Sequence, residues 1–135
     1  MVIFEYYEHI AIGILTGYGL HYFLLRFTLL EMIFYYAFIV VGSLLPDIDT
    51  PKSYIGHKFK LLSTIIFQIV GHRTLTHSIL LITIIFIIVS LIWGINTIIV
   101  GLTIGSVMHV LGDMLTGKVA CLYPINKKKI GFIKK

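Results

Sequence analysis

Long runs of apolar residues limit the folds that are open to this chain. Four such runs occupy residues 10–30, 32–45, 75–93 and 95–115. Of the 135 residues, 58% are hydrophobic and only 13% are charged, whereas a soluble domain contains roughly 45–50% apolar residues. The sequence therefore predicts a membrane protein, in which helices satisfy the backbone polar groups within the hydrocarbon layer.

The lengths of the runs predict how often the chain crosses the membrane. A transmembrane helix needs about 20 mostly apolar residues, and we interpret the four runs as four spans. A fifth run, at residues 61–70, is too short to span, and we expect an interfacial or re-entrant helix there. We therefore predict a single all-α domain over residues 1–135, a polytopic transmembrane helix bundle of about four spans plus one short interfacial helix, with three or five spans as alternatives.

The basic residues predict the orientation of this bundle. Alternating spans place residues 1–9, residues 47–73 and the tail from Lys118 at one end, which we call side A. All of the 11 Lys and Arg residues except Arg26 fall at side A. By the positive-inside rule side A is cytoplasmic, so we expect an inner (plasma) membrane protein with both termini in the cytoplasm.

Charge, the N-terminal segment and cysteine content narrow the function classes further. The net charge of +5 fits contact with membrane lipids better than nucleic-acid binding, and we expect no nucleic-acid partner. The segment Met1 to Glu5 has no basic region and no cleavage site, so we expect no cleavable signal. The single cysteine, Cys121, excludes an internal disulfide and any multi-cysteine zinc motif.

Histidines and carboxylates gather at side A. Such residues are costly near a membrane unless they are paired or coordinated, so their collection at one level predicts a functional site. Seven residues belong to this group: His9, Asp47, Asp49, His72, His77, His109 and Asp113.

The local spacing of two pairs suits metal ligation. His109 and Asp113 are four residues apart, so both project from one face of a helix. Asp47 and Asp49 follow Pro46, and in extended backbone alternate residues point the same way. Taken alone, the first pair could be a proton relay or a packing hydrogen bond, and the second a solvated turn. Because both pairs are expected at the same end of the bundle, a metal or catalytic cluster is favoured.

The remaining two histidines are five residues apart, which would separate them on one helix. We therefore predict that His72 lies in a turn at Gly71 and that His77 lies one turn into a helix capped by Thr74. Four imidazoles and three carboxylates without a thiol suit zinc first, with manganese or iron as alternatives. Seven ligands exceed the four of a closed structural zinc site, so we expect two ions.

Several polar residues near the cluster have other expected roles. Arg73 is placed to clamp an anionic substrate oxygen, and it is expected to act in catalysis together with Asp49. His21 lies in mid-span and is interpreted as a packing residue. His57 is expected at the surface, with a role as a metal ligand as the alternative, because it is close to the cluster. The basic side chains at Lys52, Lys58 and Lys60 are expected to face anionic lipid headgroups, with Lys52 and Ser53 also close enough to meet a substrate.

These motifs resemble those of the YdjM-like (DUF457) family, described as LexA-regulated inner-membrane proteins and metal-dependent hydrolases. The matching segments are Glu8-His9, Leu44–Ser53 (LLPDIDTPKS), Gly71–Ser78 (GHRTLTHS), His109–Thr116 (HVLGDMLT) and Leu122–Pro124. The resemblance implies the same seven metal ligands and does not include His21 or His57. More remotely, the order of these motifs is similar to zinc-dependent phospholipase C, which implies a phosphoester substrate.

Three functions follow as competing expectations. The first is a metal-dependent hydrolase that acts on an amphiphilic ester or phosphoester at the interface, in which the metal activates water and Arg73 stabilises the developing charge. The second is a metal-binding or ion-translocating membrane protein without hydrolysis. The third is a structural protein regulated through its basic tail. Because few polar residues continue toward the opposite end, which we call side B, the sequence favours the enzyme.

Overall fold

The computed structural model describes residues 5–132, which are all-helical with no named strand. The elements are α1 (Tyr6–Leu24), α2 (Leu29–Leu44), the 3-10 helix η1 (Leu45–Asp49), α3 (Tyr54–Lys58), α4 (Lys60–Val70), α5 (Ile79–Trp93) and α6 (Thr97–Thr116). The all-α prediction is thus confirmed. Residues 1–4, on which the expectation about a cleavable signal rests, and the last two lysines of the basic tail lie outside the described residues.

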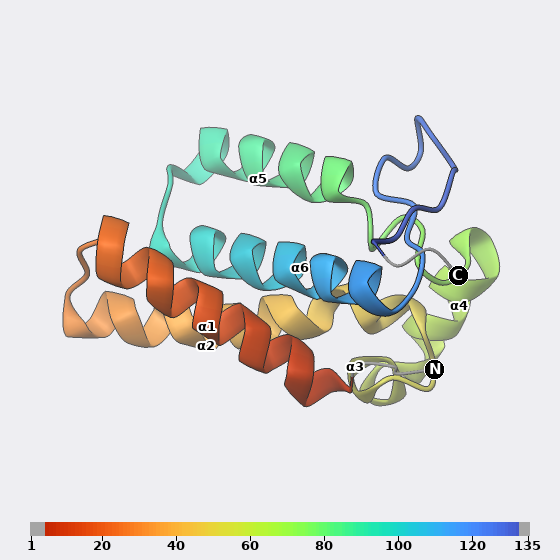
Figure 1. Cartoon of the computed structure of the whole chain (residues 1–135), viewed down its shortest axis with the longest axis horizontal. Coiled ribbons are helices and arrows are strands. Elements are labelled where there is room, and N and C mark those ends of the chain that lie inside the picture. The colour runs from red at the N-terminus through yellow and green to blue at the C-terminus, as the bar shows by residue number, and fades with distance from the viewer. Residues whose placement is uncertain (1–4, 133–135) are drawn as a thin grey trace.

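The four long helices run back and forth, so that chain segments distant in sequence share an end (Figure 1). The connections 25–28 and 94–96 lie at one end. At the other end are the start of α1, the end of α2, the start of α5, the end of α6 and the short helices α3 and α4. This second end is side A, and it carries the predicted cluster.

Glycines allow α2 and α6 to approach closely at the centre of the bundle. A Cβ at Gly105 would collide with the backbone oxygen of Ile39, and one at Gly42 with the backbone oxygen of Leu102. The hydroxyl of Ser106 donates a hydrogen bond of 3.1 Å to the Gly42 carbonyl. Small residues permit such close helix contacts within membranes, where apolar burial drives association only weakly. This contact fixes the position of α6 and of its metal-ligand candidates.

Capping side chains move several helix boundaries away from those predicted. Thr28 and Glu31 form a reciprocal capping box, so the second helix begins at Leu29 rather than at residue 32. Helix α1 ends at Leu24, several residues before residue 30, where the predicted first run ends. The short helix predicted at residues 61–70 is present as α4, but α3 was not predicted.

The prediction of about four spans is only partly supported by helix length and composition. Two helical segments, Leu29–Asp49 and Thr97–Thr116, are long and apolar enough to cross a membrane. Helix α5 has 15 residues, because residues 75–78 belong to a loop. Helix α1 has 19 residues, and it is less apolar because it carries Glu8, His9 and His21.

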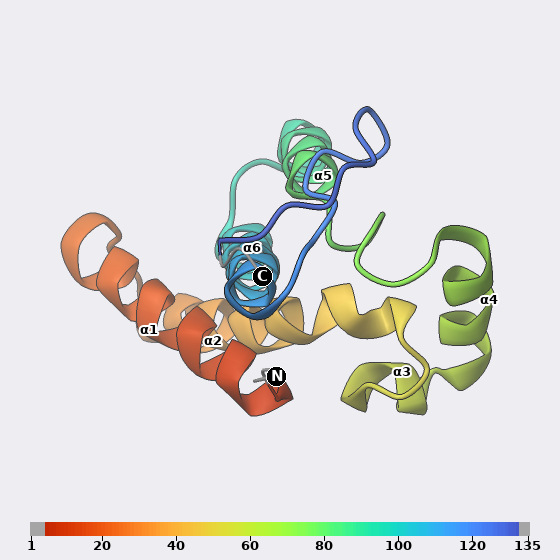
Figure 2. The ribbon, with the colours of Figure 1, turned by 45° about the vertical axis from the view of Figure 1, so that its right-hand side comes forward.

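Helix α5 nevertheless exposes an extended apolar surface. It packs mainly on α6 and stands apart from α1 and α2 (Figure 2). None of its residues is buried, although the helix is almost entirely apolar. Leu91, for example, is 82% exposed. Such an extended apolar surface marks contact with a membrane or another protein.

Candidate metal centre

The seven predicted residues come from four parts of the chain at side A. His9 lies in the first turn of α1, the two aspartates of the Asp47-Ile-Asp49 motif lie in η1, and His109 and Asp113 lie in the second half of α6. The loop before α5 contributes His72 and His77. Five of the seven are almost completely buried, namely His9, Asp49, His77, His109 and Asp113.

Ligand atoms of Asp47, His77, His109 and Asp113 all lie within 4.8 Å of one another. The Nε2 atom of His77 is 3.2 Å from Asp113 Oδ2 and 3.7 Å from Asp47 Oδ1. The Nε2 atom of His109 is 3.6 Å from the same Asp47 oxygen. His9 extends this group, because its ring stacks on that of His109 at 3.9 Å and its Nε2 lies 3.7 Å from Asp113 Oδ1. We call these five residues the inner group.

Hydrogen bonds to the opposite ring nitrogens orient both central imidazoles. The Nδ1 atom of His109 lies 2.6 Å from the carbonyl oxygen of Ser43. A carbonyl only accepts, so Nδ1 carries the proton and Nε2 of the neutral ring keeps its lone pair. The Nδ1 atom of His77 likewise lies 3.2 Å from Asp49 Oδ2. A histidine that donates its second nitrogen to a carbonyl or carboxylate is the usual arrangement at metal sites.

The Nε2 atoms of His77 and His109 indicate that a metal ion fits the inner group. Both are buried and have no hydrogen-bond partner among the described residues. Buried polar atoms rarely remain unsatisfied in native proteins. Both atoms face the carboxylates of Asp47 and Asp113, so a cation bound between them would satisfy all four groups. Nitrogen and oxygen donors without sulfur suit zinc, manganese or iron.

A second group of possible ligands consists of Asp47, Asp49, His72 and His77, and it shares two members with the inner group. Asp49 is fully buried at its centre. Its carboxylate is held by hydrogen bonds or close polar contacts with the Thr50 hydroxyl, the His72 ring, the Arg73 backbone N–H and the Thr76 hydroxyl. Asp49 therefore organises the loop of residues 71–78 and orients His77.

Arg73 is the predicted anion clamp, but its guanidinium already binds a carboxylate. Its Nε donates to Asp113 Oδ2 at 2.9 Å and its Nη2 donates to Asp113 Oδ1 at 2.6 Å. Gly117 leaves room for this arrangement, since a Cβ there would collide with the guanidinium. The clamp role stays a prediction. In this structure, Arg73 orients Asp113 and balances its charge.

Electrostatics favour a positive charge at the inner group. Burial lowers the pKa of His77, but the neighbouring carboxylates of Asp113, Asp47 and Asp49 raise it more, to about 10. At neutral pH the ring of the metal-free chain therefore carries a second proton, on Nε2, which lies 3.2 Å from Asp113 Oδ2 without the geometry of a hydrogen bond. A metal ion would take the place of this proton, because a ligating imidazole must be neutral.

The structure corrects two local predictions. Asp47 and Asp49 lie in a 3-10 helix rather than in extended backbone. The cap of α5 is Ser78 rather than Thr74, so His77 lies before the helix instead of inside it. The physical reason is the tail, because the Ser78 hydroxyl also donates to the carbonyl of Tyr123 at 2.7 Å. That contact joins residues 45 positions apart and has no local sequence signal.

The other two histidines lie outside the inner group. His21 is near side B, where its ring meets that of Phe27 edge to face at 5.2 Å, in agreement with a packing role. His57 lines a polar cavity beside Asp47. Sequence reasoning did not identify the Ser43 carbonyl or the Thr76 hydroxyl, which support the histidines, because a backbone carbonyl and a lone threonine carry no motif.

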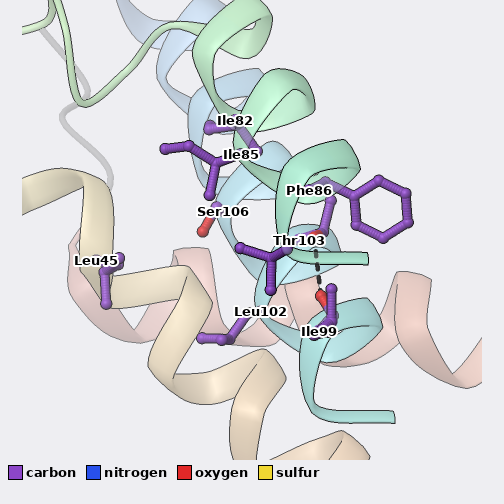
Figure 3. Close-up of a pocket in the computed structure, with 9 residues that line it drawn as sticks. Leu45, Ile82, Ile85, Phe86, Ile99, Leu102, Thr103 and Ser106 are labelled. Atoms are coloured by element: carbon purple, nitrogen blue, oxygen red, sulfur yellow. Dashed lines mark hydrogen bonds between the residues drawn. The ribbon is translucent and has the colours of Figure 1, made fainter. Parts of the chain in front are cut away.

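An apolar groove lies within the helix bundle (Figure 3). It has a volume of about 160 Å³ and lies between α5 and α6, with Leu45 on its other side. Leu45 is two residues before Asp47, and Ser106 is one helical turn before His109. The groove therefore ends close to the inner group and is lined by Ile82, Ile85, Phe86, Ile99 and Leu102, among others.

Comparisons with known proteins agree with the motifs. The model of a family described as "YdjM inner membrane protein" matches residues 5–134. The chain is 41% identical over 85 residues to the uncharacterized protein YvsG of Bacillus subtilis, which covers 62% of this chain and 53% of YvsG. It is 38% identical over 91 residues to inner membrane protein YdjM of Escherichia coli, covering 63% of this chain and 46% of that protein. The chain thus spans about half the length of the curated relatives it matches, and no solved structure matches it.

Proposed function

Because the chain belongs to the YdjM inner membrane protein family, we propose that it is a membrane-bound, metal-dependent hydrolase acting on an ester or phosphoester of an amphiphilic, lipid-like substrate at the cytoplasmic interface. The observation that carries this proposal is the pair of buried Nε2 atoms, of His77 and His109, which lack hydrogen-bond partners in the described chain and face two carboxylates. Zinc is the metal proposed first, with manganese and iron as alternatives.

The inner group would hold one ion through Asp47, His77, His109 and Asp113, with His9 beside them. The second group would hold another ion through Asp47, Asp49 and His72. A bound divalent metal supplies a water of lowered pKa, near 7, and polarises the scissile group. The chain itself would orient the metal ligands. Asp49 holds the Nδ1 proton of His77, and Arg73 fixes both oxygens of Asp113.

The apolar groove supports an amphiphilic substrate. An alkyl chain lying between α5 and α6 would have its polar end near Leu45 and Ser106, which is the end of the groove closest to the inner group. The groove lining is apolar apart from Thr103 and Ser106, and the hydroxyl of Thr103 is satisfied by the Ile99 carbonyl. Burial of an alkyl chain there contributes roughly 0.8 kcal/mol per CH₂ group.

We place four spans in the membrane, α1, α2 with η1, α5 and α6, with both termini in the cytoplasm. The grouping of basic residues at side A supports this orientation. The exposed apolar surface of α5 supports its inclusion among the four spans. Its length of 15 residues is compatible with a span, since the bilayer can thin locally around a short helix. The alternative of ion translocation is less well supported, because glycine contacts and aromatic rings, rather than a chain of ligands, lie between the inner group and side B.

An activity screen tests the hydrolase proposal. The full chain, purified in detergent and loaded with zinc, manganese or iron in turn, would be given a panel of lipid esters and lipid phosphoesters. We expect turnover of at least one substrate, which a chelator stops and the same metal restores. Asp113→Asn should lose that activity, whereas His21→Gln, which changes a histidine at side B, should keep it. Turnover that persists in Asp113→Asn would contradict the assignment of the site.

A further inference from the structure

The open side of the inner group is a polar cavity rather than a continuation of the apolar groove. The side chain of Asp47 is 25% exposed, whereas those of His77, His109 and Asp113 are 0%, 1% and 4% exposed. Asp47 lines a cavity of about 490 Å³ between the start of α1, η1 and α3. Asp47 is therefore the inner-group residue that this cavity exposes, which makes the cavity a suitable position for a substrate headgroup.

Two lysines make this cavity suitable for an anion. Lys52 and Lys58 both line it, and neither forms a salt bridge within residues 5–132. Lys58 Nζ lies 4.6 Å above the centre of the Tyr54 ring, which holds the ammonium group at the cavity wall. Arg73 already binds Asp113 through Nε and Nη2, so its charge is balanced by that carboxylate and only Nη1 is left for a second anion. Lys52 and Lys58 are therefore cations without an ion-pair partner among the described residues, and they line the same cavity as the exposed ligand Asp47.

The cavity wall is a built structure rather than a loose loop. The Ser53 hydroxyl donates to the carbonyl of Asp47 at 2.7 Å and accepts from the backbone N–H of Gly56 at 3.0 Å. A Cβ at Gly56 would collide with the carbonyl of Thr50. On the opposite side the ring of Tyr6 stacks on that of Tyr54, with centroids 4.8 Å apart. These contacts join η1, α3 and α1 and fix where the lysines stand relative to Asp47.

We propose that this cavity, through Lys52 and Lys58, binds the phosphate headgroup of the amphiphilic substrate, an inference that rests on the proposed function. Glu5 and Asp47 also line the cavity, but Asp47 is a proposed ligand whose charge a divalent ion would more than offset. The volume lies within the roughly 300–1,000 Å³ of small-molecule sites. A phosphate there would be bound by two ammonium groups and would lie beside the metal, so the substrate class is a phosphorylated lipid rather than a neutral ester.

Calorimetric titration of the full chain in a non-ionic detergent tests this proposal. Three ligands serve as probes: dioctanoyl phosphatidate, inorganic phosphate and neutral dioctanoylglycerol. We expect phosphatidate to bind more tightly than either of the others, because it alone carries both a phosphate group and alkyl chains. Inorganic phosphate binding as tightly as phosphatidate would instead identify a free-phosphate site and contradict a lipid substrate.

Charge-matched variants separate the cavity from general surface attraction. Lys52→Gln and Lys58→Gln should each weaken phosphatidate binding roughly 10-fold or more, since each removes a charge-assisted hydrogen bond. Lys60→Gln removes the same charge from α4, outside the cavity lining, and should change binding less than twofold. Equal losses in all three variants would overturn the proposal.

Metal content measured on the same samples distinguishes this proposal from the hydrolase proposal. A metal-loaded chain whose phosphatidate binding is independent of both lysines would refute the headgroup site alone. A chain without metal and without hydrolysis, but with lysine-dependent phosphatidate binding, would refute the hydrolase and retain the site as a lipid-binding one.

Discussion

Arg73 and Asp113 form a two-point ion pair, in which Nε and Nη2 of the guanidinium bind the two carboxylate oxygens at 2.9 and 2.6 Å. The pair joins the loop before α5 to the second half of α6 across 40 positions of sequence. Both oxygens of Asp113 also face histidine nitrogens of the inner group. Arg73 thus controls the orientation of a proposed metal ligand from outside the ligand set.

This relationship predicts that Arg73→Ala lowers metal affinity as well as any activity. We expect a loss of about 10- to 100-fold, the usual effect of removing a partner that orients a ligand. Arg73→Lys should recover only part of it, because an ammonium group cannot bind both oxygens in the same fork. Competition with a chromogenic chelator measures the affinity. Wild-type metal affinity in Arg73→Ala would show that Arg73 is free to serve as the substrate clamp instead.

The same contact makes Gly117 a sensitive position. A methyl group there would collide with the Arg73 guanidinium, while the backbone conformation at Gly117 is open to any residue. Gly117→Ala should therefore weaken metal binding in the direction of Arg73→Ala, by a smaller factor. The matched control is Gly19→Ala, since a Cβ at Gly19 meets nothing within 4 Å. If the two alanine variants bind metal equally well, the guanidinium can move without cost.

The glycine contact between α2 and α6 predicts a loss of stability on enlargement. In Gly105→Ala the new methyl group would meet the backbone of α2, and overpacking of this kind costs about 1–3 kcal/mol. It should also move His109 away from the Ser43 carbonyl. Thermal unfolding in detergent should show a lower midpoint for Gly105→Ala than for Gly19→Ala. Equal midpoints would mean that the two helices are not in contact there.

The pKa of His77, raised to about 10, predicts how pH affects the metal-free chain. A histidine in the unfolded chain titrates near 6.5, so the stabilisation from its protonated ring is complete below that pH. It is lost as pH rises from 6.5 through about 10. Metal-free protein should therefore lose thermal stability across this range, and metal-loaded protein should lose less. Denaturation scans of His77→Gln should show a weaker pH dependence; a dependence as steep as in the parent chain would contradict the assignment.

Topology gives a further prediction that does not depend on metal. Cys121 is buried and is the only cysteine, so Cys121→Ser provides a background for single-cysteine labelling. In inside-out membrane vesicles, a cysteine at Lys60 or Lys129 should react with an impermeant maleimide, and one at Asn96 should not. Labelling of Lys60 and Asn96 positions from the same side would contradict the four-span arrangement.

Sequence reasoning predicted those features that depend on helix periodicity and direction. Alternating helices bring His9, the Asp47-Ile-Asp49 motif and the end of α6 together, and the four-residue spacing of His109 and Asp113 does place both at the inner group. The loop of residues 71–78 could not be predicted in the same way. Its conformation depends on the buried Asp49 carboxylate and on the tail at Tyr123, which are contacts between distant positions.

The predicted anion clamp shows the same limit. A local pattern identifies Arg73 as a cation beside the cluster, but its partner Asp113 is set by tertiary packing. The predicted third span was too long for a related reason, because hydropathy alone assigned residues 75–78 to a helix that begins at Ile79, after its cap Ser78. In both cases the local sequence indicated the chemical character of the residues correctly, whereas the tertiary fold determined their contacts.

Metal content of the purified full chain is the most direct test of the central claim that the inner group binds a divalent metal. Elemental mass spectrometry of protein purified without chelator should find at least one equivalent of zinc, manganese or iron per chain. His77→Gln should lose most of it, because His77 belongs to both ligand groups, while His21→Gln should retain it. A folded parent chain that holds no metal after equilibration with each of the three ions, or a His77→Gln chain with unchanged content, would contradict the account.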